Sequence, residues 1–165
     1  MPYPFTPNDD ANRLLAQDGT ALLIGMCLDQ QVRTETAFAG PFRLRERIRT
    51  IDAAKIAALP PSKLAAAFRT KPALHRYPGM MSKRVRALCS TIVRDYAGKG
   101  ARVWTGIKTG EAAFERLVAL PGFGQAKANC GVRILGKFGR VPLAGWRRFA
   151  SDGDLPWVYE NGRRI

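Results

Sequence analysis

The sequence predicts an all-α fold built as a single domain. Apolar residues recur with helical spacing along most of the chain, and no segment shows the strict alternation of a half-buried strand. The 165 residues suffice for one domain of ordinary size with a sizeable core. A Pro-Gly-x-Gly turn at 121–124 joins two helical patterns, at 111–119 and 125–138. We therefore take residues 1–165 as one domain with a helical core at 20–140.

The first predicted helix is apolar on nearly every side. Thr20 is expected to cap it, and an apolar run follows from Leu22 to Leu28. A helix that is hydrophobic all round is typically buried, so this one should lie at the centre of the fold. The polar sequence Asp29-Gln30-Gln31 ends it abruptly.

The middle of the chain predicts six helical segments separated by Gly, Pro and polar residues: 34–38, 42–48, 52–59, 62–68, 72–77 and 82–96. Gly40-Pro41 should break or kink the helix between the segments 34–38 and 42–48. Ser62 should cap the helix that follows Pro60-Pro61. The last segment is amphipathic, with these residues facing the core: Val85, Leu88, Ile92 and Val93.

The final helix pair carries the sharpest motif, the turn at 121–124. Thr109 should cap its first helix. Pro121 fixes φ, while Gly122 and Gly124 allow positive φ and leave the backbone open. Free N–H groups at the start of the second helix favour an anion, and Lys127 adds charge there. The motif predicts a sequence-independent phosphate clamp, with an ordinary helix–turn–helix connection as the alternative.

The charge is strongly positive and uneven. The net charge is +14, and residues 69–108 contain ten Lys or Arg against one acid. A solvated surface is the simple interpretation of a charge run. An imbalance of this size favours a polyanionic partner such as DNA, RNA or an anionic membrane.

Cysteine and histidine are sparse. Cys27, Cys89 and Cys130 are widely spaced and His75 is the only histidine. This pattern argues against a disulfide scaffold, a zinc finger and a four-cysteine iron–sulfur cluster. The N-terminus lacks the pattern of a signal peptide, and no apolar run is long enough to span a bilayer. We expect a cytoplasmic protein, associated with the nucleoid if the source is prokaryotic.

Three segments together resemble the HhH-GPD superfamily of base-excision DNA glycosylases. Leu120-Pro121-Gly122-Phe123-Gly124 resembles its helix–hairpin–helix, here at about 111–138. The segment 22–32, LLIGMCLDQQV, resembles the buried helix that ends in a glutamine-bearing turn. The segment 81–88, MSKRVRAL, resembles the helix start that follows the family's basic loop. The three matches span about 20–140 in the family's order.

The resemblance implies a helical fold with a cleft, in which 1–19 and 141–165 form a reduced second subdomain. It implies binding of double-stranded, damaged DNA by a monomer. The sparse cysteines and short apolar runs, rather than the resemblance, predict that there is no iron–sulfur cluster and no membrane association. Gln31 would fill the gap left by a flipped base. The backbones of Val118, Leu120 and Phe123 would hold Na⁺ or K⁺. The implied DNA-binding residues are Gln30, Gln31, Leu120, Gly122, Phe123, Gly124, Gln125, Lys127, Lys83 and Arg84.

The catalytic pattern departs from the family. Its nucleophilic lysine corresponds to Ala126 here, and we expect Lys127 to contact phosphate rather than to act as a nucleophile. The family's aspartate should lie near 141–146, a stretch without an acid. The remaining catalytic candidates are Asp29, Asp152, Asp154 and Lys127, each aspartate having a solvated turn as its alternative. Trp146 is the candidate for stacking on an extruded base.

Two functional hypotheses follow, with a third less favoured. The first is a monofunctional DNA N-glycosylase, a hydrolase that flips a damaged base and hydrolyses its N-glycosidic bond. The second is a non-catalytic protein of the same fold that recognises damaged or distorted DNA. An unrelated basic helical protein, for instance one that binds RNA, is disfavoured by the hairpin together with the Gln-Gln turn. The sequence does not distinguish alkylated, oxidised, deaminated and mismatched bases.

Overall fold

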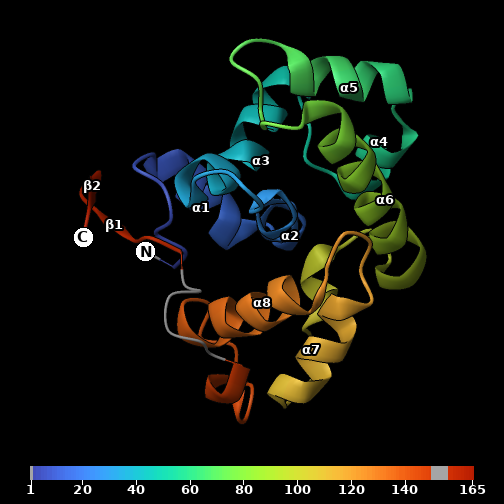
Figure 1. Cartoon of the computed structure of the whole chain (residues 1–165). Coiled ribbons are helices and arrows are strands. Elements are labelled where there is room, and N and C mark those ends of the chain that lie inside the picture. Colours follow the sequence, from blue (N-terminus) through green and yellow to red (C-terminus); the bar gives the residue numbers. More distant parts are fainter. Residues whose placement is uncertain (1, 150–155) are drawn as a thin grey trace.

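The structure, a computed structural model, describes residues 2–149 and 156–165 and confirms the all-α prediction. No helix among these residues is long and apolar enough to cross a membrane. The elements in chain order (Figure 1) are α1 (Asp9–Gln17), α2 (Gly19–Leu28), α3 (Thr34–Ile48), α4 (Ala53–Ala58), α5 (Pro61–Arg69), α6 (Pro78–Tyr96), the 3₁₀ turn η1 (Gly100–Val103), α7 (Gly110–Val118), α8 (Gln125–Lys137), the 3₁₀ turn η2 (Trp146–Phe149), β1 (Tyr159–Glu160) and β2 (Arg163–Arg164).

Helix α2 is the buried centre of the fold, as predicted. Every residue from Thr20 to Leu28 is buried, and α2 contacts α1, α3, α6, α8 and η1. Figure 1 shows α2 nearly end-on, with α1 and α3 beside it and α8 below. Because so many elements pack on α2, its C-terminal end has a fixed position relative to α8 and α6.

The start of α2 differs from the prediction. Asp18, not Thr20, caps the helix by accepting the Ala21 N–H. Thr20 lies in the first turn, where its hydroxyl accepts the buried Gly100 N–H at 3.0 Å. The hydroxyl thus joins α2 to η1, a long-range contact that local sequence does not reveal.

Helix α3 runs unbroken through Pro41, so the predicted break at Gly40-Pro41 is wrong. Pro41 and its neighbours Phe38 and Leu44 are buried, and this packing holds the helix together despite the missing N–H.

Three further local predictions are wrong. Pro60, not Ser62, precedes α5, because Pro61 suits the first helical position. Residues 72–77 form bends rather than a helical turn. Val93 faces solvent, with 38% of its surface exposed.

The two ends of the chain lie together. Phe5 is fully buried and its ring packs against those of Phe38 and Phe138. The Tyr159 N–H donates to the Pro4 carbonyl at 2.7 Å, which places the short antiparallel β1–β2 ribbon beside the N-terminal segment. Neither this ribbon nor α1 was predicted from the sequence.

The helix pair α7–α8 matches its prediction closely. Thr109 caps α7 by accepting the Ala112 N–H, and α8 begins at Gln125 directly after the glycine turn. Leu117 and Val132 are fully buried, so the pair packs through its apolar faces. The turn between these helices is thereby held in a fixed place at the surface.

We expect Gly100→Ala to destabilise the protein by about 1–3 kcal/mol, because the new methyl group would overpack a backbone contact. The added Cβ would lie 2.5 Å from the Thr20 nitrogen. Urea unfolding measures the change. Gly124→Ala is the control, since a Cβ there meets nothing within 4 Å. Equal stability of Gly100→Ala and the wild type would contradict this packing.

Candidate functional site

The turn before α8 combines an anchored interior with an open backbone. Leu120 and Phe123 are buried, and the Phe123 N–H closes the turn on the Leu120 carbonyl at 3.1 Å. Gly122 has φ +80°, as predicted. Gly124 has φ −83°, so the prediction of positive φ there is wrong. No side chain caps α8, and its first N–H groups are available to an anion.

Helix α6 supplies a basic neighbour to this turn. A Cβ on Gly122 would contact the Arg84 side chain at 3.4 Å, so the two residues pack closely. The Arg84 guanidinium donates to Gln30 Oε1 at 2.9 Å, and Lys83 beside it is exposed. The structure therefore brings the predicted residues of the turn, of α6 and of the Gln-Gln segment together.

Gln31 is exposed at the end of α2 and has a left-handed backbone, with φ +55°. Its side-chain oxygen accepts the Tyr77 hydroxyl at 3.0 Å. Tyr77 is itself 37% exposed, so both side chains are accessible from solvent. The contact holds Gln31 at the surface next to the loop at 72–77.

His75 lies in the interior and is only 3% exposed. Its Nε2 lies 3.0 Å from the Leu28 carbonyl, and its Nδ1 accepts the Tyr77 N–H at 2.9 Å. Only a neutral ring protonated at Nε2 satisfies both partners. Burial is the largest cause that lowers the His75 pKa, in agreement with this form.

Lys127 also turns toward the C-terminal end of α2. Its ammonium donates to the Cys27 carbonyl at 2.7 Å and lies 3.4 Å from the Gly122 carbonyl. A cation at a helix C-terminus is favoured by the dipole and by the free carbonyl groups. The structure thus places the Lys127 ammonium against α2, whereas the sequence analysis expected it on a phosphate.

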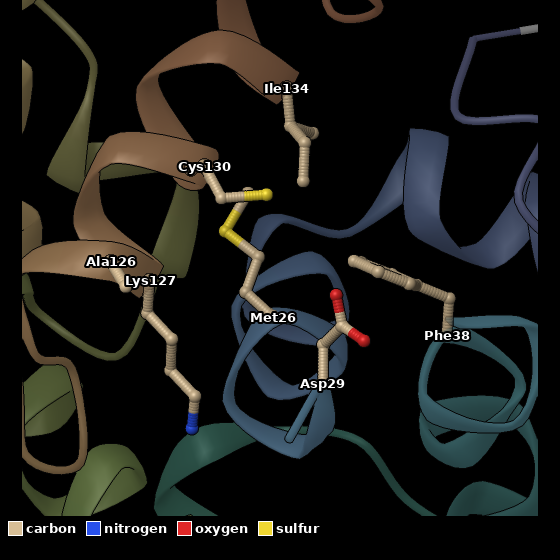
Figure 2. Close-up of a pocket in the computed structure, with 8 residues that line it drawn as sticks. Met26, Asp29, Phe38, Ala126, Lys127, Cys130 and Ile134 are labelled. Carbon is tan, nitrogen blue, oxygen red and sulfur yellow. The ribbon is translucent and has the colours of Figure 1, made fainter. Parts of the chain in front are cut away.

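A pocket of about 170 Å³ separates α8 from the ends of α2 and α3. Figure 2 shows the Asp29 carboxylate reaching into it from the end of α2. Apolar side chains and the charged groups of Asp29 and Lys127 share its wall, and its lining residues are Met26, Asp29, Phe38, Ala126, Lys127, Cys130, Gly131 and Ile134.

The pocket shifts the pKa values of its two charged residues, Asp29 and Lys127, from their ordinary values. Burial raises the Asp29 pKa to about 6, and the positive charge of Lys127 offsets only part of that rise. Burial likewise lowers the Lys127 pKa. The two groups form no ion pair, and the ammonium donates instead to the Cys27 carbonyl. A carboxylate and an amine with perturbed pKa values in one cleft indicate a functional site.

The remaining candidates lie elsewhere. Trp146 packs over Gly136, near the far end of α8, and Arg147 covers its ring at 4.5 Å. Trp146 does not line the Asp29 pocket. Asp152 and Asp154 lie outside the described residues. Within the described part of the chain, no three His, Cys, Asp or Glu side chains are grouped to hold a metal ion.

The apolar lining of the pocket was not predicted from the sequence. Met26 and Phe38 had only core signatures, and Cys130 was considered only for disulfides and metals. A pocket between helices depends on tertiary packing, which local patterns do not report.

Comparisons with solved structures support the fold. Scans against protein-family models and curated proteins find no match. The chain is similar to endonuclease III in a trapped covalent DNA intermediate, with a TM-score of 0.54 and 19% identity over 81% of this chain. It is also similar to a non-covalent endonuclease III–DNA complex, with a TM-score of 0.54 and 18% identity over 87% of this chain. The chain spans 58% and 64% of those two chains. These similarities show that the chain shares the fold of endonuclease III, in agreement with the all-α fold expected from the sequence.

We expect Asp29→Asn to stabilise the protein at pH 7.5 by about 3 kcal/mol, since the pKa of Asp29 is raised by about two units and one unit corresponds to ~1.4 kcal/mol. The folded-state pKa of about 6 exceeds the ordinary aspartate value. The wild-type protein therefore keeps its full stability below about pH 4, where Asp29 is protonated, and loses part of it as the pH rises through 6 and Asp29 ionises. Asparagine stays neutral and avoids that loss.

Urea unfolding of both proteins at several pH values measures this difference. The difference in unfolding free energy between Asp29→Asn and wild type should be largest at pH 7.5. It should shrink as the pH falls through 6 and should not change further below about pH 4. The control is Glu115→Gln, which neutralises an exposed carboxylate on α7. A difference between wild type and Asp29→Asn that does not depend on pH would contradict the raised pKa.

Proposed function

We propose that this protein is a monofunctional DNA glycosylase that flips a damaged base into the Asp29 pocket and hydrolyses its N-glycosidic bond. One observation carries the proposal: the glycine turn, the exposed Gln31 and a carboxylate-bearing pocket meet around the C-terminal end of α2. The fold shared with endonuclease III, solved in complexes with DNA, supports it.

Phosphate binding would begin at the uncapped start of α8. The exposed Gly124 and Gln125 offer backbone N–H groups there, and Lys83 and Arg84 add positive charge. These groups do not read base identity, so they would position the duplex without selecting a sequence. The net charge of +14 adds a long-range attraction that salt should weaken.

Gln31 would enter the duplex where the base leaves. Unstacking a base costs a few kcal/mol, and a polar side chain with donors and acceptors can replace some of the lost hydrogen bonds. The Tyr77 hydroxyl holds Gln31 in place before DNA arrives, which reduces the entropy lost on binding.

Asp29 would be the catalytic carboxylate. Water adds to C1′ of the sugar, the C1′–N bond breaks, and its electron pair leaves with the base. An ionised Asp29 would stabilise the positive charge that develops on the sugar and accept the proton of the water. Since its pKa is about 6, the carboxylate is mostly ionised at neutral pH. Asp152 and Asp154 remain candidates for the same role.

A lyase step through an amine is not part of the proposal. Ala126 stands at the position of the family's lysine. The Lys127 ammonium, one residue later, is held by the Cys27 carbonyl. Hydrolysis would therefore release the base and leave an abasic site with the strand intact.

The turn would also hold Na⁺ or K⁺ through the carbonyls of Val118, Leu120 and Phe123. The Leu120 carbonyl accepts the Phe123 N–H and keeps a second lone pair for such an ion. The ion would add positive charge beside the phosphate.

The second candidate function is DNA binding without catalysis. The absence of an acid in 141–146 and Ala126 at the lysine position favour it. Both candidates need the same DNA-binding surface, so base release is the property that separates them.

We expect the protein to release a base from at least one duplex in a panel of alkylated, oxidised, deaminated and mismatched substrates. Single-turnover reactions followed by alkali reveal abasic sites, and a parallel borohydride reaction traps any Schiff base. The expected outcome is release without trapping, with a rate that rises through about pH 6 and falls strongly in Asp29→Asn. Salt-sensitive binding without release on every duplex would instead establish the non-catalytic alternative.

We expect Gly124→Asp to weaken DNA binding at least tenfold, or about 1.4 kcal/mol, because it places a carboxylate where a phosphate should bind. Fluorescence anisotropy with a labelled duplex measures the affinity. Asn161→Asp makes the same charge change at the exposed turn of the β1–β2 ribbon, beyond the opposite end of α8 in Figure 1. Equal losses in the two variants would show that only net charge matters.

A further inference from the structure

The Asp29 pocket has a chemical character that bears on its substrate. Most of its wall is apolar or soft: the Met26 thioether, the Phe38 ring, the Cys130 thiol and the Ile134 side chain surround the carboxylate. Figure 2 shows Asp29 between Met26 and Phe38, with Cys130 and Ile134 across the space. The carboxylate is thus the main polar group on this side of the pocket.

The cations nearest to this carboxylate are engaged with other groups. Lys127 donates to the Cys27 carbonyl, and Arg84 donates to Gln30. No described residue donates a hydrogen bond to the Asp29 carboxylate or forms an ion pair with it. The effect of burial on the Asp29 pKa is also larger than the opposing effect of the Lys127 charge. A partly buried charge without a direct partner is costly, and a ligand of opposite charge would relieve that cost.

We propose that the pocket selects a base with a positive charge, the class formed when a ring nitrogen of a purine is alkylated. The proposal rests on the glycosylase function proposed above. The Asp29 carboxylate would supply the counter-charge, while Phe38 and Met26 offer the π and sulfur contacts that favour flat, electron-poor rings.

Neutral lesions fit this lining less well. Deaminated and oxidised bases carry no net positive charge, so an ionised Asp29 gains no charge–charge attraction from them. The ammonium that could donate to their carbonyl oxygens is held at the Cys27 carbonyl. The pocket therefore favours a cationic base over a neutral one by charge.

The chemistry of a cationic base matches a site with one carboxylate. When the C1′–N bond breaks, its electron pair neutralises the positive charge, and the base leaves as a neutral molecule. No acid is needed to protonate the leaving group. Water supplies the oxygen that bonds to C1′, and its proton passes to Asp29 and then to solvent. A chain without an acid at 141–146 can carry out this reaction.

The test compares duplexes that differ only at one position, which holds N7-methylguanine, guanine, uracil, hypoxanthine or 8-oxoguanine. Single-turnover base release and equilibrium binding are measured for wild type, Asp29→Asn and the control Glu115→Gln. We expect wild type to release N7-methylguanine about tenfold faster than any neutral base, and to bind its duplex more tightly than the guanine duplex. A tenfold difference corresponds to about 1.4 kcal/mol.

Asp29→Asn should abolish the binding preference for N7-methylguanine, measured as the ratio of its affinity to that of the guanine duplex. Glu115→Gln should retain both. Release confined to neutral bases, or a preference that survives in Asp29→Asn, would overturn the inference while leaving a glycosylase. If no duplex releases a base, the proposed function fails and binding decides the inference: a preference that depends on Asp29 supports a cation-selective pocket, and equal affinities overturn it.

Discussion

The C-terminal end of α2 imposes the main constraint on this structure, because its carbonyl groups need donors in a buried environment. Lys127 from α8 bonds the Cys27 carbonyl, and His75 from the 72–77 loop bonds the Leu28 carbonyl. Unpaired buried carbonyls cost about 1–3 kcal/mol each, so these contacts are strongly favoured. They also fix the glycine turn and the Tyr77–Gln31 pair relative to α2. The candidate DNA-binding surface therefore depends on the capping of one buried helix.

Asp29 lies at the same helix end, where it is electrostatically unfavourable. A negative charge at a helix C-terminus opposes the dipole, and burial raises its pKa further. Selection for stability alone would not favour a carboxylate there. Such residues are concentrated at functional sites, where binding a ligand or a transition state recovers the cost. A cationic substrate would recover it directly.

The sequence predicted the elements whose signals are local. The apolar run of α2, the cap at Thr109 and the positive φ of Gly122 all follow from short patterns and agree with the structure. Pro41 was misjudged because packing on both sides keeps α3 intact.

The candidate site was predicted only in part. The glycine turn and the Gln-Gln segment were found, and Asp29 was one of several acids considered. The positions of His75 and Lys127 could not be predicted, since each bonds a carbonyl far away in the sequence, and Lys127 reaches back 100 residues. The same holds for the pocket lining, which comes from α2, α3 and α8.

Replacing Lys127 with Met tests the central claim most directly, because it separates a structural role from a phosphate contact. Urea unfolding and the salt dependence of duplex binding are measured on the same variant. If the ammonium caps α2, the free energy of unfolding should fall by about 1–3 kcal/mol, and the slope of log K against log salt should stay unchanged. Unchanged stability together with a slope smaller by about one would identify Lys127 as a phosphate contact and contradict this account.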